Sequence, residues 1–223
     1  MSNGEREREA RVLEAVRERR EQVNAAVEQD LPPAEPERLY AASRHLIEAG
    51  GKRLRPALVL LVAEALGGES DDYYAFPGLD GDEVDVMTAA VGVELIHTFT
   101  LAHDDIMDED DIRRGECAVH REYDLSTAIL AGDTLFAKGF DLLTRTGAKP
   151  ERQLTAIRRL AETCTRICEG QELDVEWEVE EEGVAEGDRR RVERKTGGLY
   201  GAAAASRAGV RGADEETGDA SYQ

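Results

Sequence analysis

The chain has 223 residues, of which 41% are hydrophobic and only 5% aromatic, and it carries a formal net charge of −20. Such an acidic chain repels nucleic acid and anionic membrane surfaces unless its positive charges are concentrated locally, so no nucleic-acid partner is expected. The three cysteines form neither a disulfide framework nor a zinc-binding pattern. The longest apolar run, residues 57–63, is too short to span a bilayer, and the charged N-terminus is no signal peptide. The sequence predicts a soluble, cytoplasmic protein without a membrane span.

Apolar residues at helical spacing, separated by Pro and Gly, predict seven helices. In chain order, they are expected over residues 5–29, 35–49, 57–66, 83–107, 126–144, 150–178 and 187–208. The segment 69–82, rich in Gly, Pro and Asp, is predicted to be a loop, and the helix over 83–107 is apolar enough to be the central one. No linker-like stretch divides the chain. We therefore expect an all-α antiparallel helical bundle that forms a single domain over residues 1–223.

Six carboxylates fall within the eight residues 104–111, at the end of the predicted central helix. Asp104 and Asp108 are four residues apart, so they share a helix face and lie about 6 Å apart along the axis. Hard oxygen ligands at this separation suit magnesium. A solvated acidic turn is the alternative, but the apolar residues that lead into the cluster place it at the rim of a core. The sequence therefore predicts a metal site at Asp104 and Asp108.

Positive charges gather at two places near predicted helix ends. Lys52, Arg53 and Arg55 lie in a loop that starts with two glycines and precedes a helix N-terminus. There the backbone N–H groups and the helix dipole also favour a multiply charged anion such as diphosphate. Arg113 and Arg114 follow the acidic cluster. They either form surface ion pairs or bind the phosphate that a metal on the carboxylates would bridge.

His97 lies seven residues before Asp104, which is two helical turns, so the two side chains share a face of the predicted helix. A histidine within a helix is more often packed in a core than functional. Its spacing from the carboxylates is what suggests that it donates a hydrogen bond to a phosphate.

Six motifs follow one another in order over residues 50–199. They are Gly-Gly-Lys-Arg-Leu-Arg-Pro at 50–56, Leu-Ile-His-Thr-Phe-Thr-Leu-Ala-His-Asp-Asp-Ile-Met-Asp at 95–108, Asp-Asp-Ile-Arg-Arg-Gly at 110–115, Gly-Asp-Thr-Leu at 132–135, Gly-Gln-Glu-Leu-Asp at 170–174 and Lys-Thr-Gly-Gly-Leu at 195–199. Any one of them is weak, but the ordered set resembles the trans-prenyltransferase (polyprenyl synthase) family. The resemblance implies a helical bundle of the isoprenoid-synthase type around a central cavity for the prenyl chain.

The same resemblance implies an activity: head-to-tail condensation of isopentenyl diphosphate with an allylic diphosphate, for the synthesis of isoprenoids and membrane lipids. It also implies Mg²⁺ bound by Asp104 and Asp108, and a homodimer. It assigns isopentenyl diphosphate to Lys52, Arg55, His97 and Arg114. It assigns the allylic diphosphate to Arg113, Lys195 and Thr196, of which Lys195 and Thr196 join Asp104 and Asp108 as catalytic residues.

Phe99 lies five residues before Asp104, more than one helical turn back along the predicted tunnel wall. An aromatic ring at this position resembles the archaeal geranylgeranyl type, in which it blocks further elongation. We therefore expect a C20 product, with C25 as the alternative.

The family pattern has a second Asp-rich motif after the Lys-Thr site, and this chain departs from it. Only 27 residues follow Thr196, and none of them forms Asp-Asp-x-x-Asp. We expect a C-terminally truncated chain without the portion that carries this motif. The alternatives are then a non-catalytic subunit that binds prenyl diphosphates, or an inactive fragment.

A metal-dependent phosphohydrolase is a further alternative, suggested by the neighbouring His103 and Asp104. That class needs more His and Asp ligands at helical positions. It also leaves the cations Lys52, Arg55 and Lys195 without a role, so the prenyltransferase is preferred.

Overall fold

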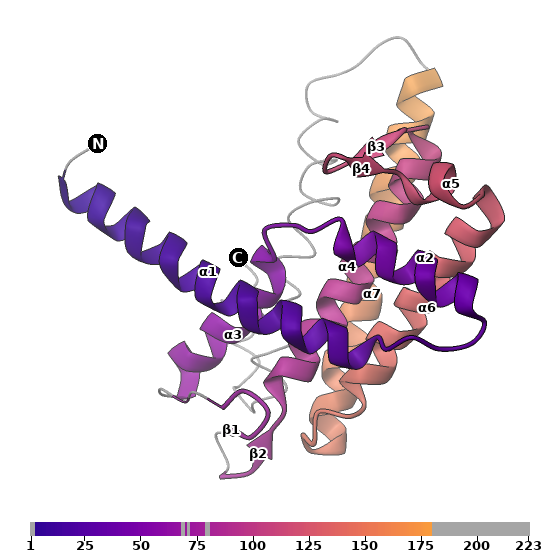
Figure 1. Cartoon of the computed structure of the whole chain (residues 1–223). Coiled ribbons are helices and arrows are strands. Elements are labelled where there is room, and N and C mark those ends of the chain that lie inside the picture. The colour runs from indigo at the N-terminus through magenta and orange to yellow at the C-terminus, as the bar shows by residue number, and fades with distance from the viewer. Residues whose placement is uncertain (1–2, 68–69, 71, 79–80, 180–223) are drawn as a thin grey trace. The chain divides into compact units, whose positions relative to one another are not determined.

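The computed structural model describes residues 3–67, 70, 72–78 and 81–179, and Figure 1 shows the order of their elements. The helices are α1 (Asn3–Asp30), α2 (Glu37–Glu48), α3 (Leu54–Gly67), α4 (Val86–Met107), α5 (Val119–Glu122), α6 (Leu125–Leu143) and α7 (Pro150–Val179). The strands are β1 (Phe76–Pro77), β2 (Glu83–Val84), β3 (Ile112–Arg113) and β4 (Glu116–Cys117). The predicted all-α fold is confirmed. The helix expected over 187–208 lies outside the described residues.

Most predicted helix limits agree with the structure to within three residues, and the differences have local causes. The helix α3 begins at Leu54 instead of residue 57, because Pro56 stands in the first turn, where a backbone N–H has no partner within the helix. Residues 83–84, which were expected to open the central helix, instead form β2 and pair with β1 inside the predicted loop. Neither the two antiparallel strand pairs nor α5 was predicted, because two to four residues carry too little hydrophobic pattern.

Backbone contacts divide the chain into two compact units. The first unit comprises Met1–Leu60 and Met87–Arg145, and the second comprises Leu61–Val86 and Thr146–Gln223. The single domain that the sequence suggests stays a prediction.

In the first unit, α4 is the central helix. All of residues 86–98 are buried, which explains why the sequence of this helix is apolar on every face. The helix α6 runs close beside α4 (Figure 1), because Gly92 and Gly139 face each other at their crossing. Small side chains of α2, α4, α5 and α6 fill a core between these helices: Ala42, Ala102, Val119, Ala128 and Ala131.

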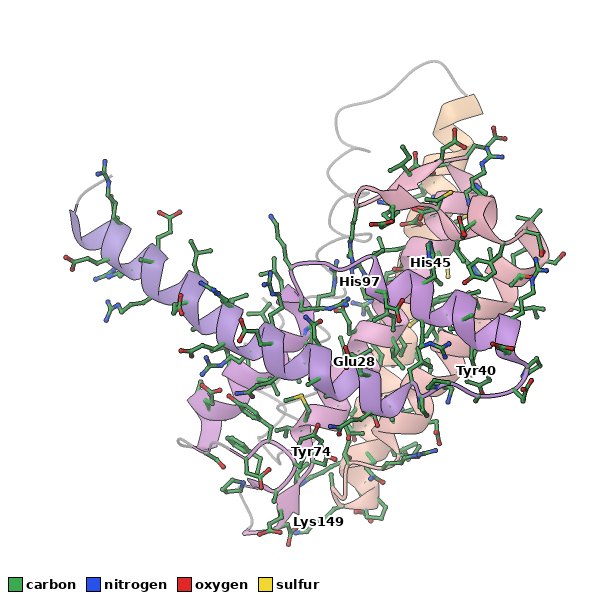
Figure 2. All side chains as sticks on the ribbon, in the orientation of Figure 1. Glu28, Tyr40, His45, Tyr74, His97 and Lys149 are labelled. Atoms are coloured by element: carbon green, nitrogen blue, oxygen red, sulfur yellow. The ribbon has the colours of Figure 1, made fainter. Side chains whose placement is uncertain are left out.

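Polar contacts secure the outer helices of the first unit. The N-cap Asp124 accepts a hydrogen bond from the backbone N–H of Thr127 at 2.8 Å, which begins α6 and lowers the pKa of Asp124. Tyr40 and His45 project from α2 (Figure 2). The Tyr40 ring lies 5.4 Å from the ammonium of Lys138 on α6, and His45 Nε2 is 2.8 Å from the carbonyl oxygen of Cys117.

The described part of the second unit contains the end of α3, the β1–β2 pair and α7. Phe76 is fully buried and its ring stacks on that of Tyr73, with the centroids 5.9 Å apart. The backbone N–H of Asp85 donates to the carbonyl of Thr146 at 2.8 Å, which ties the start of α4 to the segment before α7. One face of α7 is buried at helical spacing, through Ala156, Leu160, Thr163, Cys164, Ile167 and Gln171.

Among the described helices, α4 is long and apolar enough to cross a membrane. Of that stretch, 72% is buried inside the structure, which is the pattern of a helix that fills a protein core.

Candidate functional site

The loop between α2 and α3 turns sharply, and its backbone explains the two glycines. Gly50 and Gly51 have φ angles of 80° and 149°, which side chains with a Cβ rarely adopt. Arg53 also has a positive φ, 48°. The loop exposes Lys52, which forms no ion pair with the described residues, whereas it buries Arg53 to 5% exposure.

Arg53 therefore does not join the other loop cations, contrary to the expectation that all three would face one anion. Its Nη1 donates to Glu94 Oε1 on α4 at 2.7 Å, and both side chains of this ion pair are only 3% exposed. Its remaining nitrogens donate to Asn24 Oδ1 and to the carbonyl of Ile47, at 2.9 and 2.8 Å. Arg53 is thus neutralised and held from three sides inside the first unit.

Arg55, two residues further on, turns toward α4 and meets His97 (labelled in Figure 2). Arg55 Nη1 lies 2.8 Å from His97 Nε2. Burial, followed by the neighbouring guanidinium of Arg55, lowers the pKa of His97 to about 2. The imidazole is therefore neutral at any working pH and accepts the hydrogen bond from Arg55. A neutral ring that accepts at Nε2 carries its proton on Nδ1, so the predicted hydrogen bond from His97 to a phosphate stays a prediction.

The strands β3 and β4 form a hairpin with a two-residue turn, Arg114 and Gly115, whose φ angles of 55° and 91° are those of a type I′ turn. The turn sends neighbouring arginines to different partners. Arg113 forms ion pairs with Asp105 and, at 3.2 Å, with Asp110. Arg114 lies over Gly51, where an added Cβ would stand 2.5 Å from Arg114 Nη1. The hairpin therefore links the acidic cluster to the cationic loop.

The last turn of α4 carries the predicted metal ligands. The backbone N–H of Asp108 donates to the carbonyl of Asp104 at 2.8 Å, so the two carboxylates occupy successive turns of one helix face. Asp104 is half-buried and Asp108 is exposed. Asp105 is 1% exposed and turns toward Arg113, and burial raises its pKa despite that partner. The negative end of the helix dipole adds to the attraction of this end for a cation.

More than one turn before Asp104 on α4, half-buried aromatic rings begin a row between α4 and α6. The Phe99 ring lies 4.8 Å from Phe136 and 4.6 Å from the imidazole of His103, and Phe136 lies 5.0 Å from Phe140. Gly132 makes room for His103, because a Cβ there would stand 2.8 Å from its Nε2. Only Phe99 was singled out from the sequence.

The described part of the first unit contains the predicted residues Lys52, Arg55, His97, Phe99, Asp104, Asp108, Arg113 and Arg114. Of these, Arg55 contacts His97. Lys195 and Thr196 lie outside the described residues. Sequence reasoning missed Glu94, although a signal was present: it is the one carboxylate in residues 86–103 of an apolar helix. It also missed Phe136 and Phe140, which read as ordinary core residues.

Proteins of one family resemble this chain. Residues 36–223 match the polyprenyl synthetase family. The chain is 57% identical over 212 residues to a geranylfarnesyl diphosphate synthase of Natronomonas pharaonis, covering 94% of this chain and 62% of that protein. It is 45% identical over 209 residues to a geranylgeranyl diphosphate synthase of Methanosarcina mazei, covering 94% of this chain and 60% of that protein.

The structure also resembles a geranylgeranyl pyrophosphate synthetase of the archaeon Geoglobus acetivorans, with a TM-score of 0.84 and 42% identity over 93% of this chain and 63% of that one. The chain therefore spans about three-fifths of the length of these relatives. The predicted resemblance is confirmed by a match that covers most of the chain and by a shared all-α fold. The chain belongs to the polyprenyl synthetase family.

Proposed function

We propose that this chain forms part of a prenyltransferase site. This part binds isopentenyl diphosphate, and it also carries half of the ligands for the metal cluster that holds an allylic diphosphate. The observation that carries the proposal is the β3–β4 turn, which delivers Arg113 to the carboxylates and Arg114 to the cationic loop. Two anion sites side by side, one served by cations alone and one also by metal, suit a reaction between two diphosphates.

Isopentenyl diphosphate would bind Lys52, Arg55 and Arg114. Lys52 and Arg55 belong to the glycine loop, and Arg114 lies over Gly51 of that loop. Glu94 already neutralises Arg53. His97 would contribute through Arg55, because the neutral imidazole holds the guanidinium by its hydrogen bond. Dense, pre-oriented donors bind a multiply charged anion without reorganising.

The allylic diphosphate would bind at the end of α4, with Arg113 beside it. The donor set there fits Mg²⁺, which is commonly held by one or two carboxylates and completes its shell with water and substrate phosphate oxygens. Asp104 and Asp108 supply two such oxygen ligands on one helix face. We also propose that Lys195 and Thr196 contact this diphosphate. Bound magnesium would supply positive charge that favours departure of the diphosphate group.

The proposed reaction breaks an allylic C–O bond and forms a new C–C bond. The allylic C–O bond breaks and its electron pair leaves with diphosphate, stabilised by the surrounding cations. The double bond of isopentenyl diphosphate forms the new C–C bond to the allylic carbocation, and loss of a proton restores a double bond. The products are a chain five carbons longer, diphosphate and a proton. The aromatic row of Phe99, Phe136 and Phe140 would keep water from the cation.

The product would be C20, with C25 as the alternative. The Phe99 ring, backed by Phe136 at 4.8 Å, stands between α4 and α6 where a lengthening tail would run. The relatives are named for both lengths, geranylgeranyl and geranylfarnesyl. The prenyl diphosphate would then serve the synthesis of isoprenoids and membrane lipids.

We propose a cytoplasmic homodimer that needs neither nucleic acid nor a membrane span. Exposed apolar side chains on α6 support an association between copies: Leu125, Ile129 and Leu130, with exposures of 54%, 38% and 57%. Light scattering after size exclusion would give the mass of a dimer, and a monomeric mass would contradict this part of the proposal.

The central experiment uses the 223-residue chain with Mg²⁺, farnesyl diphosphate and radiolabelled isopentenyl diphosphate. The expected result is labelled C20 or C25 diphosphate together with released diphosphate. The Asp108→Asn variant loses one metal ligand, so its turnover should fall about 100-fold while the fold persists. Removal of the metal with a chelator should act in the same direction.

Other outcomes would select the alternatives. Binding of both diphosphates without product would favour a non-catalytic subunit, and neither binding nor product would favour an inactive fragment. Release of inorganic phosphate would favour a phosphohydrolase. Within the described residues, however, no group of three or more His, Cys, Asp or Glu side chains is arranged to hold a metal, as that class would need.

A further inference from the structure

Arg53 and Glu94 form an ion pair in the interior of the first unit, although they are 41 residues apart in the sequence. Their side chains are each 3% exposed, and Nη1 and Oε1 are 2.7 Å apart. Two charges withdrawn from water are tolerated only with good geometry and further hydrogen bonds. This buried ion pair lies beside the residues that are proposed to bind diphosphate, and the proposed reaction itself does not use it.

The further hydrogen bonds of Arg53 bind three helices to one loop. Its Nε donates to Asn24 on α1, its Nη1 to Glu94 on α4, and its Nη2 to the carbonyl of Ile47 on α2. The planar guanidinium spreads these donors over three nitrogens in a fixed fork, whereas the three donors of a lysine ammonium share one nitrogen on a flexible stem.

These bonds determine where the neighbouring cations lie. Arg53 stands between Lys52 and Arg55, and its backbone is in the left-handed region. Because the Arg53 side chain is drawn inward, Lys52 is exposed on one side and Arg55 reaches His97 on the other. The same loop conformation places Gly51, which has no side chain, next to the guanidinium of Arg114.

Glu94 supplies negative charge to the buried arginines of the cluster. It lies one turn before His97 on α4, and both side chains face the arginines of the loop and hairpin. Burial lowers the pKa of Arg114, and the Glu94 carboxylate opposes that shift. The carboxylate therefore supports the charged state of an arginine that it does not pair with directly.

We propose that Arg53 and Glu94 are positioning residues for the isopentenyl diphosphate site: they hold Lys52, Arg55 and Arg114 in the binding geometry without touching the ligand. The inference rests on the proposed function. It adds a role for Arg53 and Glu94, to which the family resemblance assigns none.

The test is the Arg53→Lys variant of the 223-residue chain, studied by titration calorimetry with isopentenyl diphosphate and, separately, with farnesyl diphosphate and Mg²⁺. The charge is kept but the fork is lost. The dissociation constant for isopentenyl diphosphate should rise about tenfold or more, because small misplacements of binding groups are costly. That for farnesyl diphosphate should change less than about twofold, since none of the three side-chain hydrogen bonds of Arg53 goes to the acidic cluster or the hairpin.

Two further variants make the result decisive. Arg38→Lys alters the exposed pair between Arg38 and Asp124 on the same unit and should leave both constants unchanged. The double variant Arg53→Met, Glu94→Met removes both buried charges together, so it should stay folded by circular dichroism even if Arg53→Lys does not. It too should bind isopentenyl diphosphate at least about tenfold more weakly.

The possible outcomes separate this inference from the proposed function. Unchanged affinity for isopentenyl diphosphate in either Arg53 variant would overturn the positioning role, and so would a fall in the number of binding sites at unchanged affinity, which marks a merely structural part. A wild-type chain that binds both ligands without turnover would overturn the proposed activity alone. A wild-type chain that binds no isopentenyl diphosphate would overturn both.

Discussion

His97 is a buried imidazole surrounded by guanidinium groups, and its protonation follows from that setting. It is 9% exposed, and burial together with Arg55, Arg114, Arg53 and Arg113 lowers its pKa to about 2. In the unfolded chain its pKa would be near 6.5. The folded protein therefore keeps this histidine neutral over a range in which the unfolded chain takes up a proton.

This difference predicts a loss of stability in acid. Below pH 6.5 the unfolded state binds one more proton than the folded state at this position, so the free energy of unfolding falls as the pH falls. The slope due to His97 approaches about 1.4 kcal/mol per pH unit. Urea unfolding at pH 7.5 and 5.5 should show that His97→Gln loses this part of the slope, whereas His45→Gln on α2 keeps it. Equal slopes in wild type and His97→Gln would contradict the prediction.

Phe99 is the residue on which product length should depend. Its ring packs against Phe136 and His103 between α4 and α6, so removing it opens space in the row. The Phe99→Ala variant should make longer products, and Phe136→Ala should do so to a smaller extent. Reversed-phase chromatography of the dephosphorylated products measures this, with Val12→Ala on the exposed face of α1 as the control. Product length unchanged in Phe99→Ala would remove the proposed role.

The helices α4 and α6 approach each other through glycine. A Cβ on Gly139 would stand 2.5 Å from Ile96 Cγ1 and 2.8 Å from the carbonyl oxygen of Gly92. Because one of these atoms belongs to the backbone of α4, a side-chain rotation cannot relieve the clash. The whole crossing, and with it the spacing of the aromatic row, depends on these two positions.

Replacing Gly139 with Ala should therefore destabilise the fold by about 1–3 kcal/mol, the usual cost of overpacking a core. The matched control is Gly4→Ala in α1, where an added Cβ meets nothing within 4 Å. Alanine there should stabilise the helix by up to about 1 kcal/mol. Chemical unfolding of both variants checks the contrast, and a Gly139→Ala protein as stable as wild type would show that the helices can separate at little cost.

The charge of the whole chain is strongly unbalanced, with 48 acidic and 28 basic residues. Few of the basic residues are lysines, and the acidic excess is typical of proteins that stay hydrated in concentrated salt. Mutual repulsion of the carboxylates opposes the compact state, and the cations of the candidate site are a local exception to the negative field.

Salt should therefore stabilise the chain. Raising KCl from about 0.1 M to 2 M shortens the screening length from about 10 Å to below 3 Å, so the melting temperature should rise by roughly 5 °C or more. Circular dichroism melts measure this, with sucrose of equal osmolality as a control for surface exclusion. A melting temperature that stays flat or falls with KCl would contradict the role of repulsion.

The amino-acid sequence by itself predicts the described long helices and the family of this protein. Apolar periodicity and Gly-Pro punctuation predict the long helices, because those signals are local and repeat over several turns. The motif at 104–108 and the glycine loop at 50–56 predict a metal site and an anion site from residue type and spacing. Among the described elements, β1–β4 and α5 were not predicted, because they are too short to carry a hydrophobic pattern.

Only the tertiary structure shows which partner each arginine of the loop and the hairpin meets. Neighbouring arginines in the two loops look alike in sequence, yet Arg53 is buried against Glu94 while Arg55 meets His97, and Arg113 pairs with Asp105 while Arg114 lies over Gly51. Loops with positive φ angles lack the regular backbone repeat of a helix or strand. The direction of a side chain in such a loop therefore cannot be predicted from residue spacing. Burial of a charge depends on a partner elsewhere in the chain, and only folding brings the two together.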